Sequence, residues 1–99
     1  MNNEKTTDPR QLLELINEWY KAHGFSLQDG TRRKQVLVTL AKTIDNPIAS
    51  QLTPKTLTDY RYNRMQTITA KTANNEMSYL NAMFNKLRKL RIIDYPCPS

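Results

Sequence analysis

The stretch TAKTANNEMSYLNAMFNKLRKLR, residues 69–91, decides the predicted fold because its apolar residues recur at helical spacing. Side chains four and three residues apart fall on one face of an α-helix. Here that face consists of Ala73, Met77, Leu80, Phe84 and Leu87, widened by Met83 and Leu90. We expect a helix that packs this stripe in a core, is capped by Thr69 and is stopped by the segment Asp94-Tyr95-Pro96.

The opposite face of the same helix is predicted to be polar. It carries Lys71, Asn75, Ser78, Ala82, Asn85 and Lys89, with one small alanine as the exception. Residues 69–91 hold five Lys or Arg and four Asn but a single acid, Glu76. This face is therefore where a partner has room to approach.

Two helix starts earlier in the chain combine a side-chain cap with proline. Asp8-Pro9 predicts the start of a first helix that ends at Gly24. Its apolar face consists of Leu12, Leu13, Leu15, Ile16, Trp19 and Tyr20. Thr53-Pro54 predicts the start of a third helix that ends near Gln66. The inward residues of the third helix are Leu57 and Tyr60.

A second helix is predicted from about Asp29 or Thr31 to Ile44, with Ser26 as an alternative, earlier cap. Its inward residues are Leu37, Leu40, Ala41 and Ile44. Asn46-Pro47 ends it, because proline disfavours the helical conformation in the residue before it. The linker that follows is expected to pack Ile48 and Leu52 under the helices.

The chain is predicted to be all-α, a single domain of four helices. Its 99 residues suit one domain, and two glycines with no alternating β-branched runs argue against strands. We place a flexible N-terminus at residues 1–7, the helical domain at residues 8–95 and the start of a linker at residues 96–99.

Composition narrows the classes of function. The longest aliphatic run, residues 36–38, is too short to span a membrane, and a single cysteine, Cys97, excludes a disulfide within the chain. No cluster of His, Cys or paired carboxylates offers a nucleophile, a base or a metal site, so we expect neither enzymatic activity of this chain alone nor a cofactor. No charged and then apolar leader opens the sequence, which favours the cytoplasm.

Positive charge is concentrated in the later part of the chain. Residues 1–29 carry three Lys or Arg and five Asp or Glu, a net charge of −2. Residues 30–99 carry twelve Lys or Arg and four Asp or Glu, a net charge of +8. Such an asymmetry is typical of proteins that bind polyphosphates.

Two of the predicted helix starts are cationic. Arg32, Arg33 and Lys34 begin the second helix and Lys71 begins the fourth, where the helix dipole makes a cation unfavourable or at best neutral for the free fold. Backbone N–H groups at a helix start favour an anion, so added cations there create a phosphate site. The cations of the last turns have instead a local reason to be present, because they complement the dipole. These are Lys86, Arg88, Lys89 and Arg91.

A set of short motifs follows the same order as these elements. They are Trp19-Tyr20, His23-Gly24, Leu27-Gln28-Asp29-Gly30 with Arg33, Asn46-Pro47-Ile48-Ala49, Tyr60-Arg61 with Arg64, Thr72-Ala73-Asn74, Leu80 and Met83-Phe84. In this order and at these separations they resemble the core-binding domain of phage-type tyrosine recombinases, the integrases, also called their SAM-like N-terminal domain. The resemblance covers nearly all of residues 10–96. Tyr95-Pro96 departs from it, since the family often has Asn-Pro leading toward the catalytic domain.

The resemblance implies a domain that forms half of a clamp around double-stranded DNA, with a separate C-terminal catalytic domain closing the other side. The His-x-x-Arg motif of that catalytic domain is missing, since Gly24-Phe25-Ser26 follows the only histidine, His23. We therefore expect this chain to position DNA without cutting it, with residues 96–99 starting the linker to the absent catalytic domain. The parent protein would be a recombinase of phage or prophage origin in a bacterial cell, and the domain alone a monomer.

In this family the starts of the second and fourth helices face DNA. The resemblance thus implies contacts from Thr31, Arg32, Arg33, Lys34, Gln35, Lys71, Thr72, Asn74 and Asn75. The cations would hold phosphates, and Asn74 or Asn75 would reach a base edge. Arg61 and Arg64 are weaker candidates, because Arg64 would as readily lie over the third helix.

Two other classes of function stay open on the sequence. A helical protein-interaction module would use the basic face to bind an acidic partner. A free-standing repressor of the helix-turn-helix kind would need a short turn, for which the linker at residues 46–52 is long.

Overall fold

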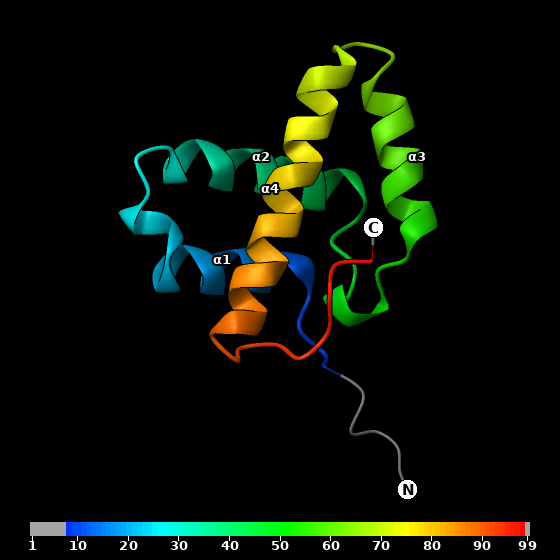
Figure 1. The fold of residues 1–99 in the computed structure, drawn as a ribbon. Helices are drawn as coiled ribbons and strands as arrows, with labels where there is room; N and C mark the ends of the chain where they lie inside the picture. Colours follow the sequence, from blue (N-terminus) through cyan, green and yellow to red (C-terminus); the bar gives the residue numbers. More distant parts are fainter. Residues whose placement is uncertain (1–7, 99) are drawn as a thin grey trace, which may run out of the picture.

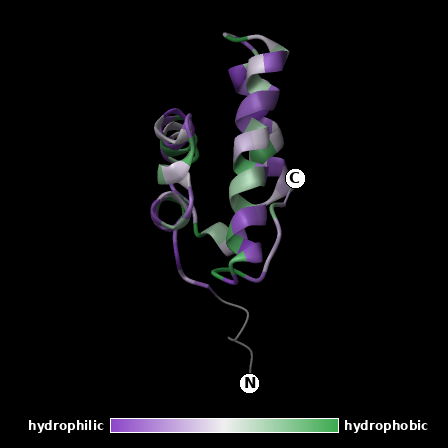
Figure 2. Cartoon of the chain, turned by 60° about the vertical axis from the view of Figure 1, so that its left-hand side comes forward, coloured by the Kyte–Doolittle hydropathy of each residue, from purple (hydrophilic) through white to green (hydrophobic). Residues whose placement is uncertain are grey.

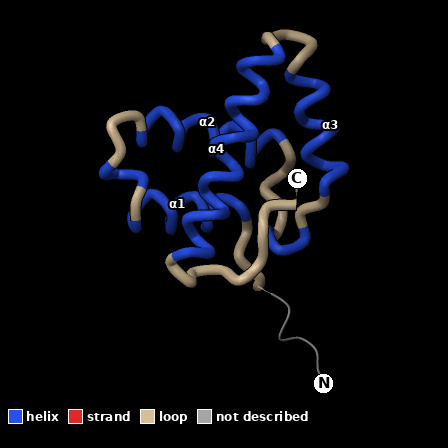
Figure 3. The backbone as a smooth tube through the Cα atoms, viewed as in Figure 1, coloured by secondary structure: helices blue, strands red, loops and turns tan. Residues whose placement is uncertain are grey.

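The computed structural model describes residues 8–98, and in this part of the chain it has four α-helices and no β-strand (Figures 1 and 3). The α-helices are α1 (Leu12–Ala22), α2 (Gly30–Thr43), α3 (Pro54–Arg64) and α4 (Ala70–Lys89), and two 3-10 turns are η2 (Gly24–Ser26) and η3 (Ala49–Gln51). The all-α, four-helix prediction is confirmed. The flexible segment predicted at residues 1–7 lies outside the described residues.

The helices form two layers (Figure 2). One layer is α1 beside α2, and the other is the hairpin of α3 and α4. The N-terminal half of α4 lies along α3, and its C-terminal half crosses α2 and α1 (Figure 1). α4 thus contacts all three other helices, and this is why its apolar stripe decides the fold.

The core lies between the two layers. It consists of Leu12, Leu15, Ile16 and Trp19 of α1, Leu37, Leu40 and Ala41 of α2, Leu57 and Tyr60 of α3, and Leu80, Met83, Phe84 and Leu87 of α4, with Ala49 of η3 and with Leu52 and Ile93 from the loops. The predicted stripe of α4 is therefore confirmed, with two differences. Met77 is only half-buried, and Leu90 is exposed because it follows the last residue of the helix.

α4 ends earlier than predicted, at Lys89. Arg91 adopts a left-handed conformation with φ of 62°, and its N–H donates to the Arg88 carbonyl at 2.9 Å. The Ile92 N–H donates to the Leu87 carbonyl at 2.9 Å. This pair of bonds is a Schellman motif, which reverses the chain and returns Ile93 to the core. The stop is therefore this reversal and not the segment Asp94-Tyr95-Pro96.

α1 begins later than predicted, at Leu12 instead of Pro9. The N–H groups of Leu12 and Leu13 donate to the Pro47 carbonyl and to Asn46 Oδ1, each at 2.9 Å. Asn46 has φ of 46°, a left-handed conformation that asparagine tolerates. The loop that ends α2 therefore also caps α1, and Asp8 is left for another role.

Asp8 joins the two ends of the described chain. Its carboxylate accepts from the Arg10 guanidinium at 3.0 and 2.8 Å and from the Tyr95 hydroxyl at 2.9 Å. Arg10 also donates to the Ile92 carbonyl at 2.7 Å. Hydrogen bonding from Arg10 outweighs burial and lowers the pKa of Asp8 to about 2. We call Asp8, Arg10 and Tyr95 the terminal clasp.

Two glycines place the start of α2 against the end of α1. A Cβ atom on Gly30 would lie 1.8 Å from the Gly24 carbonyl oxygen, and one on Gly24 would lie 2.7 Å from the Trp19 ring. Neither position has room for a larger residue. The cationic first turn of α2 is held in place by this close contact.

Candidate functional site

The outer face of α4 is exposed along its whole length. Lys71, Asn75, Ser78, Ala82, Asn85 and Lys89 are all solvent-exposed, which confirms the polar face predicted for this helix. We call these six residues the α4 outer face. Because a helix rises about 1.5 Å per residue, this line is about 27 Å long. Lys71 has no ion-pair or hydrogen-bond partner for its side chain within residues 8–98.

The first turn of α2 flanks this face. The Arg33 guanidinium donates to Asp29 Oδ2 at 3.0 Å and lies 4.9 Å from the centroid of the Tyr79 ring on α4. Lys34 Nζ lies 4.5 Å from the centroid of the Tyr20 ring on α1. Both cations are therefore fixed by aromatic rings of neighbouring helices, at a typical gain of about 0.5–1 kcal/mol each at exposed sites.

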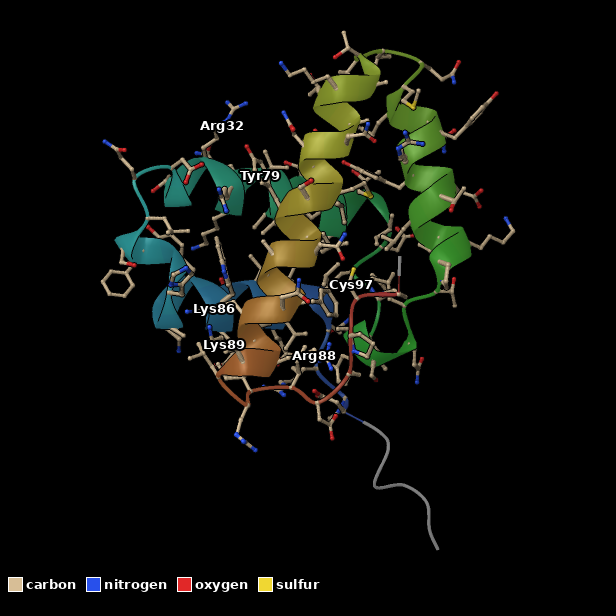
Figure 4. The ribbon with its side chains drawn as sticks, viewed as in Figure 1. Arg32, Tyr79, Lys86, Arg88, Lys89 and Cys97 are labelled. Atoms are coloured by element: carbon tan, nitrogen blue, oxygen red, sulfur yellow. The ribbon has the colours of Figure 1, made fainter. Side chains whose placement is uncertain are left out.

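The remaining predicted residues of this turn differ in exposure and contacts. Arg32 is exposed and points away from the bundle, without a side-chain partner among residues 8–98 (Figure 4). Gln35 is exposed as well, and the Thr31 hydroxyl lies 3.3 Å from the Tyr20 hydroxyl. Arg32 is thus free to meet a ligand, whereas Arg33 and Lys34 are partly engaged.

Arg33 also lines a hollow that the sequence did not predict. The hollow has a volume of about 370 Å³ and lies between α1, the start of α2 and the C-terminal half of α4. Its lining residues are Trp19, His23, Leu27, Arg33, Ala82, Asn85, Lys86 and Lys89. Three cations from two helices therefore meet at one depression, with Lys86 and Lys89 at the lower end of α4 in Figure 4.

The helix dipole already accounts for Lys86 and Lys89 locally, and this explanation gives no indication of the arrangement. A signal for Lys89 was present in the sequence, since it lies on the same face as Lys71. No local pattern indicates that α2 would bring Arg33 beside these two lysines. Their proximity depends on how α4 crosses α2.

The start of α4 forms a second group, next to α3 and away from the start of α2 (Figure 1). Lys71, Thr72, Asn74 and Asn75 are all exposed there. The Thr72 N–H donates to the Thr69 hydroxyl at 3.2 Å, so Thr72 belongs to the helix cap. Asn74 Oδ1 accepts from Arg61 Nε at 2.8 Å. The predicted residues therefore divide into two groups that the α4 outer face connects.

Arg64 is engaged in the contact between α3 and α4. Its guanidinium donates to Glu76 through Nε and Nη2 at 3.0 and 2.7 Å, and the Tyr60 hydroxyl donates to Glu76 Oε1 at 3.0 Å. Glu76 is 7% exposed, whereas the sequence had placed it among the polar positions. Its spacing of four residues before Leu80 was the available signal that it faces the core.

Protonation of this cluster follows from its contacts. Burial disfavours the charged form of Glu76, but the bonds from Arg64 and Tyr60 prevail and its pKa is lowered. Burial, aided by the neighbouring carboxylate, raises the pKa of Tyr60 to about 12. Glu76 is therefore an anion whose charge Arg64 balances inside the molecule.

Within residues 8–98, no three His, Cys, Asp or Glu side chains come together as metal ligands. Among the helices of the same region, none has both the length and the apolar character that a bilayer crossing requires.

Comparison with known proteins identifies relatives of this chain. The sequence profile of the phage integrase N-terminal domain matches residues 8–99. An integrase of Escherichia phage 186 is 31% identical over 97 residues, which cover 88% of this chain and 29% of that protein. An integrase of Haemophilus phage HP1 (strain HP1c1) is 31% identical over 96 residues, which cover 88% of this chain and 28% of that protein. The chain thus spans less than a third of these relatives, and no solved structure matches it.

Proposed function

Because this chain belongs to the phage integrase N-terminal domain family, we propose that it binds duplex DNA through the α4 outer face and the start of α2. The observation that carries the proposal is the meeting of Arg33, Lys86 and Lys89 at one hollow. Three cations gathered beside an exposed polar helix face are suited to a polyanion. Arg32 and Lys71 extend the same surface on either side.

The placement of the acidic residues supports this proposal. α4 contains a single acid, Glu76, and that acid is buried against Arg64. The α4 outer face is consequently free of negative charge along its length. A phosphate backbone that lies along it meets lysine, asparagine and serine side chains, which are the usual backbone contacts of DNA-binding proteins.

We further propose that the parent protein is a site-specific tyrosine recombinase of a phage or prophage, acting in the cytoplasm of a bacterial cell. In this arrangement the chain is the half of the clamp that positions DNA, and a catalytic domain downstream performs the strand cleavage. The terminal clasp holds the chain at the point from which it leads toward that domain. The isolated domain then binds DNA as a monomer and with little sequence preference.

The test is fluorescence anisotropy of a labelled duplex of about 30 base pairs, titrated with the domain at several salt concentrations. Each phosphate that a cation neutralises contributes about −0.9 to the slope of log K against log salt. For the wild-type domain we expect a slope of about −3 to −5. In the double variant Lys71→Ala/Lys89→Ala the slope should be shallower than that of the wild type by about 1–2.

A matched control removes two positive charges elsewhere. Lys42 lies half a turn out of phase with Arg33 on α2, and Lys55 is paired with Asp59 on α3. The variant Lys42→Ala/Lys55→Ala is expected to keep the slope of the wild-type domain within about 0.5. Equal changes in both double variants, or no binding at low salt, would contradict the proposal. The latter outcome would favour an acidic protein as the partner.

A further inference from the structure

The hydrogen bond between Arg61 and Asn74 fixes which atoms of an asparagine reach the surface. Arg61 Nε on α3 lies 2.8 Å from Asn74 Oδ1 on α4. An arginine side chain carries only hydrogen-bond donors, so the atom of Asn74 that faces it must be the carbonyl oxygen. The amide group of Asn74 therefore has one defined orientation, with its NH₂ group directed away from Arg61.

Neighbouring contacts hold Arg61 in this position. One turn later on α3, Arg64 binds the buried carboxylate of Glu76 through two hydrogen bonds at 3.0 and 2.7 Å. Bidentate pairs of this kind fix geometry as well as charge. The register of α3 against α4 is therefore set within the molecule, and Asn74 is oriented before any ligand arrives.

The surroundings of the NH₂ group determine what it can bind. Asn74 is exposed and lies three residues after Lys71, so the two side chains are neighbours on the surface of α4. The Arg61 guanidinium is on its other side. Two N–H donors between two cations attract an acceptor that carries negative charge and disfavour a second donor, such as the amino group of a base.

We propose that Asn74 is a donor-only contact to a phosphate oxygen of the DNA backbone and that Arg61 is the residue that positions it. This assignment rests on the proposed DNA-binding function and makes it more specific. It replaces the expectation that Asn74 reads a base edge, because reading adenine also requires its carbonyl oxygen as an acceptor for the adenine amino group. Asn74 then contributes affinity and register without sequence preference.

The decisive variant is Asn74→Asp. An aspartate still accepts from Arg61, so the link between α3 and α4 survives, but the outward donor becomes an acceptor. Asn63→Asp is the matched control, since it makes the same change of charge at an exposed position of α3. Binding is measured by anisotropy with several duplexes of unrelated sequence, and folding by the thermal unfolding midpoint.

We expect Asn74→Asp to weaken binding at least tenfold, equally on every duplex, with an unchanged unfolding midpoint. Asn63→Asp should weaken it less than threefold. An effect of Asn74→Asp equal to that of the control would overturn the assignment, and a loss confined to particular sequences would show a base contact instead. A wild-type domain that binds no duplex would refute the proposed function itself, which is a separate result.

Discussion

Arg64 and Glu76 form a bidentate ion pair, with Nε–Oε1 and Nη2–Oε2 distances of 3.0 and 2.7 Å, that joins α3 to α4. Glu76 also accepts from the Tyr60 hydroxyl, so two α3 side chains depend on one carboxylate. α3 rests mainly on α4, since α4 is the helix against which it makes extensive contact. The position of α3, and with it that of Arg61, therefore depends on this pair.

Replacing Glu76 with alanine is expected to lower the free energy of unfolding by about 2–4 kcal/mol. Removing one partner of a buried pair typically costs about 3–5 kcal/mol, and Arg64 retains some contact with water. The measurement is urea denaturation. Asp59→Ala is the control, because it breaks an exposed pair with Lys55 and should cost less than about 1 kcal/mol. Similar small losses in both variants would show that the Glu76 pair is not structural.

Replacing Asn46 with alanine should lower the free energy of unfolding more than replacing it with glycine. Asn46→Ala loses the cap of α1 and places alanine, which tolerates the left-handed region less well than asparagine, at φ of 46°, so we expect a loss of about 2 kcal/mol. Asn46→Gly loses the cap but relieves the backbone, so its loss should be about 1 kcal/mol. Denaturant midpoints of the two variants provide the comparison. If glycine proves as costly as alanine, the left-handed conformation contributes nothing.

The terminal clasp predicts how stability depends on pH. The pKa of Asp8 is about 2 in the folded chain and 3.8 as its ordinary value, so its contribution is present above pH 3.8 and is lost as the pH falls toward 2. The variant Asp8→Asn lacks this contribution. Its free energy of unfolding should therefore decline less steeply than that of the wild type between pH 4 and pH 2. Parallel curves from urea titrations at constant ionic strength would exclude the clasp as the cause.

Replacing Arg32 and replacing Arg33 should affect the stability of the domain differently, although both residues are expected to contact DNA. Arg32→Ala removes no side-chain bond within residues 8–98 and should change the free energy of unfolding by less than about 0.5 kcal/mol. Arg33→Ala removes the pair with Asp29 and the contact with the Tyr79 ring, so it should cost about 0.5–1.5 kcal/mol. Thermal unfolding with DNA titration of each variant checks both statements. These contacts of Arg33 argue against the expectation that every cation at the helix starts is neutral for the fold.

Local signals in the sequence predicted several boundaries well. Thr53 and Thr69 cap α3 and α4 through their hydroxyls, as their positions before Pro54 and Ala70 indicated. These caps need only a side chain and the backbone three residues on, so a short window of sequence contains all the information. The apolar stripe of α4 is predictable for the same reason.

The features that the sequence did not predict involve residues that contact each other but lie far apart in the sequence. Asp8 carries the local signature of a cap, but its carboxylate is used by Tyr95, which lies 87 residues away. Glu76 is buried because Arg64 and Tyr60 reach it from another helix. Lys86 and Lys89 join Arg33 only because α4 crosses α2. Sequence spacing within one element cannot express these relationships, and the candidate site depends on them.

The bond between Asp8 and Tyr95 has a mechanical consequence. It fastens the first described segment of the chain to the last one, with Arg10 bonded to the Ile92 carbonyl after α4 as well, and Cys97 beyond it still packs against the core. A pull on the chain at Tyr95 therefore reaches the segment that precedes α1 through this bond. Fraying of the C-terminal segment should therefore also require the bond between Asp8 and Tyr95 to open.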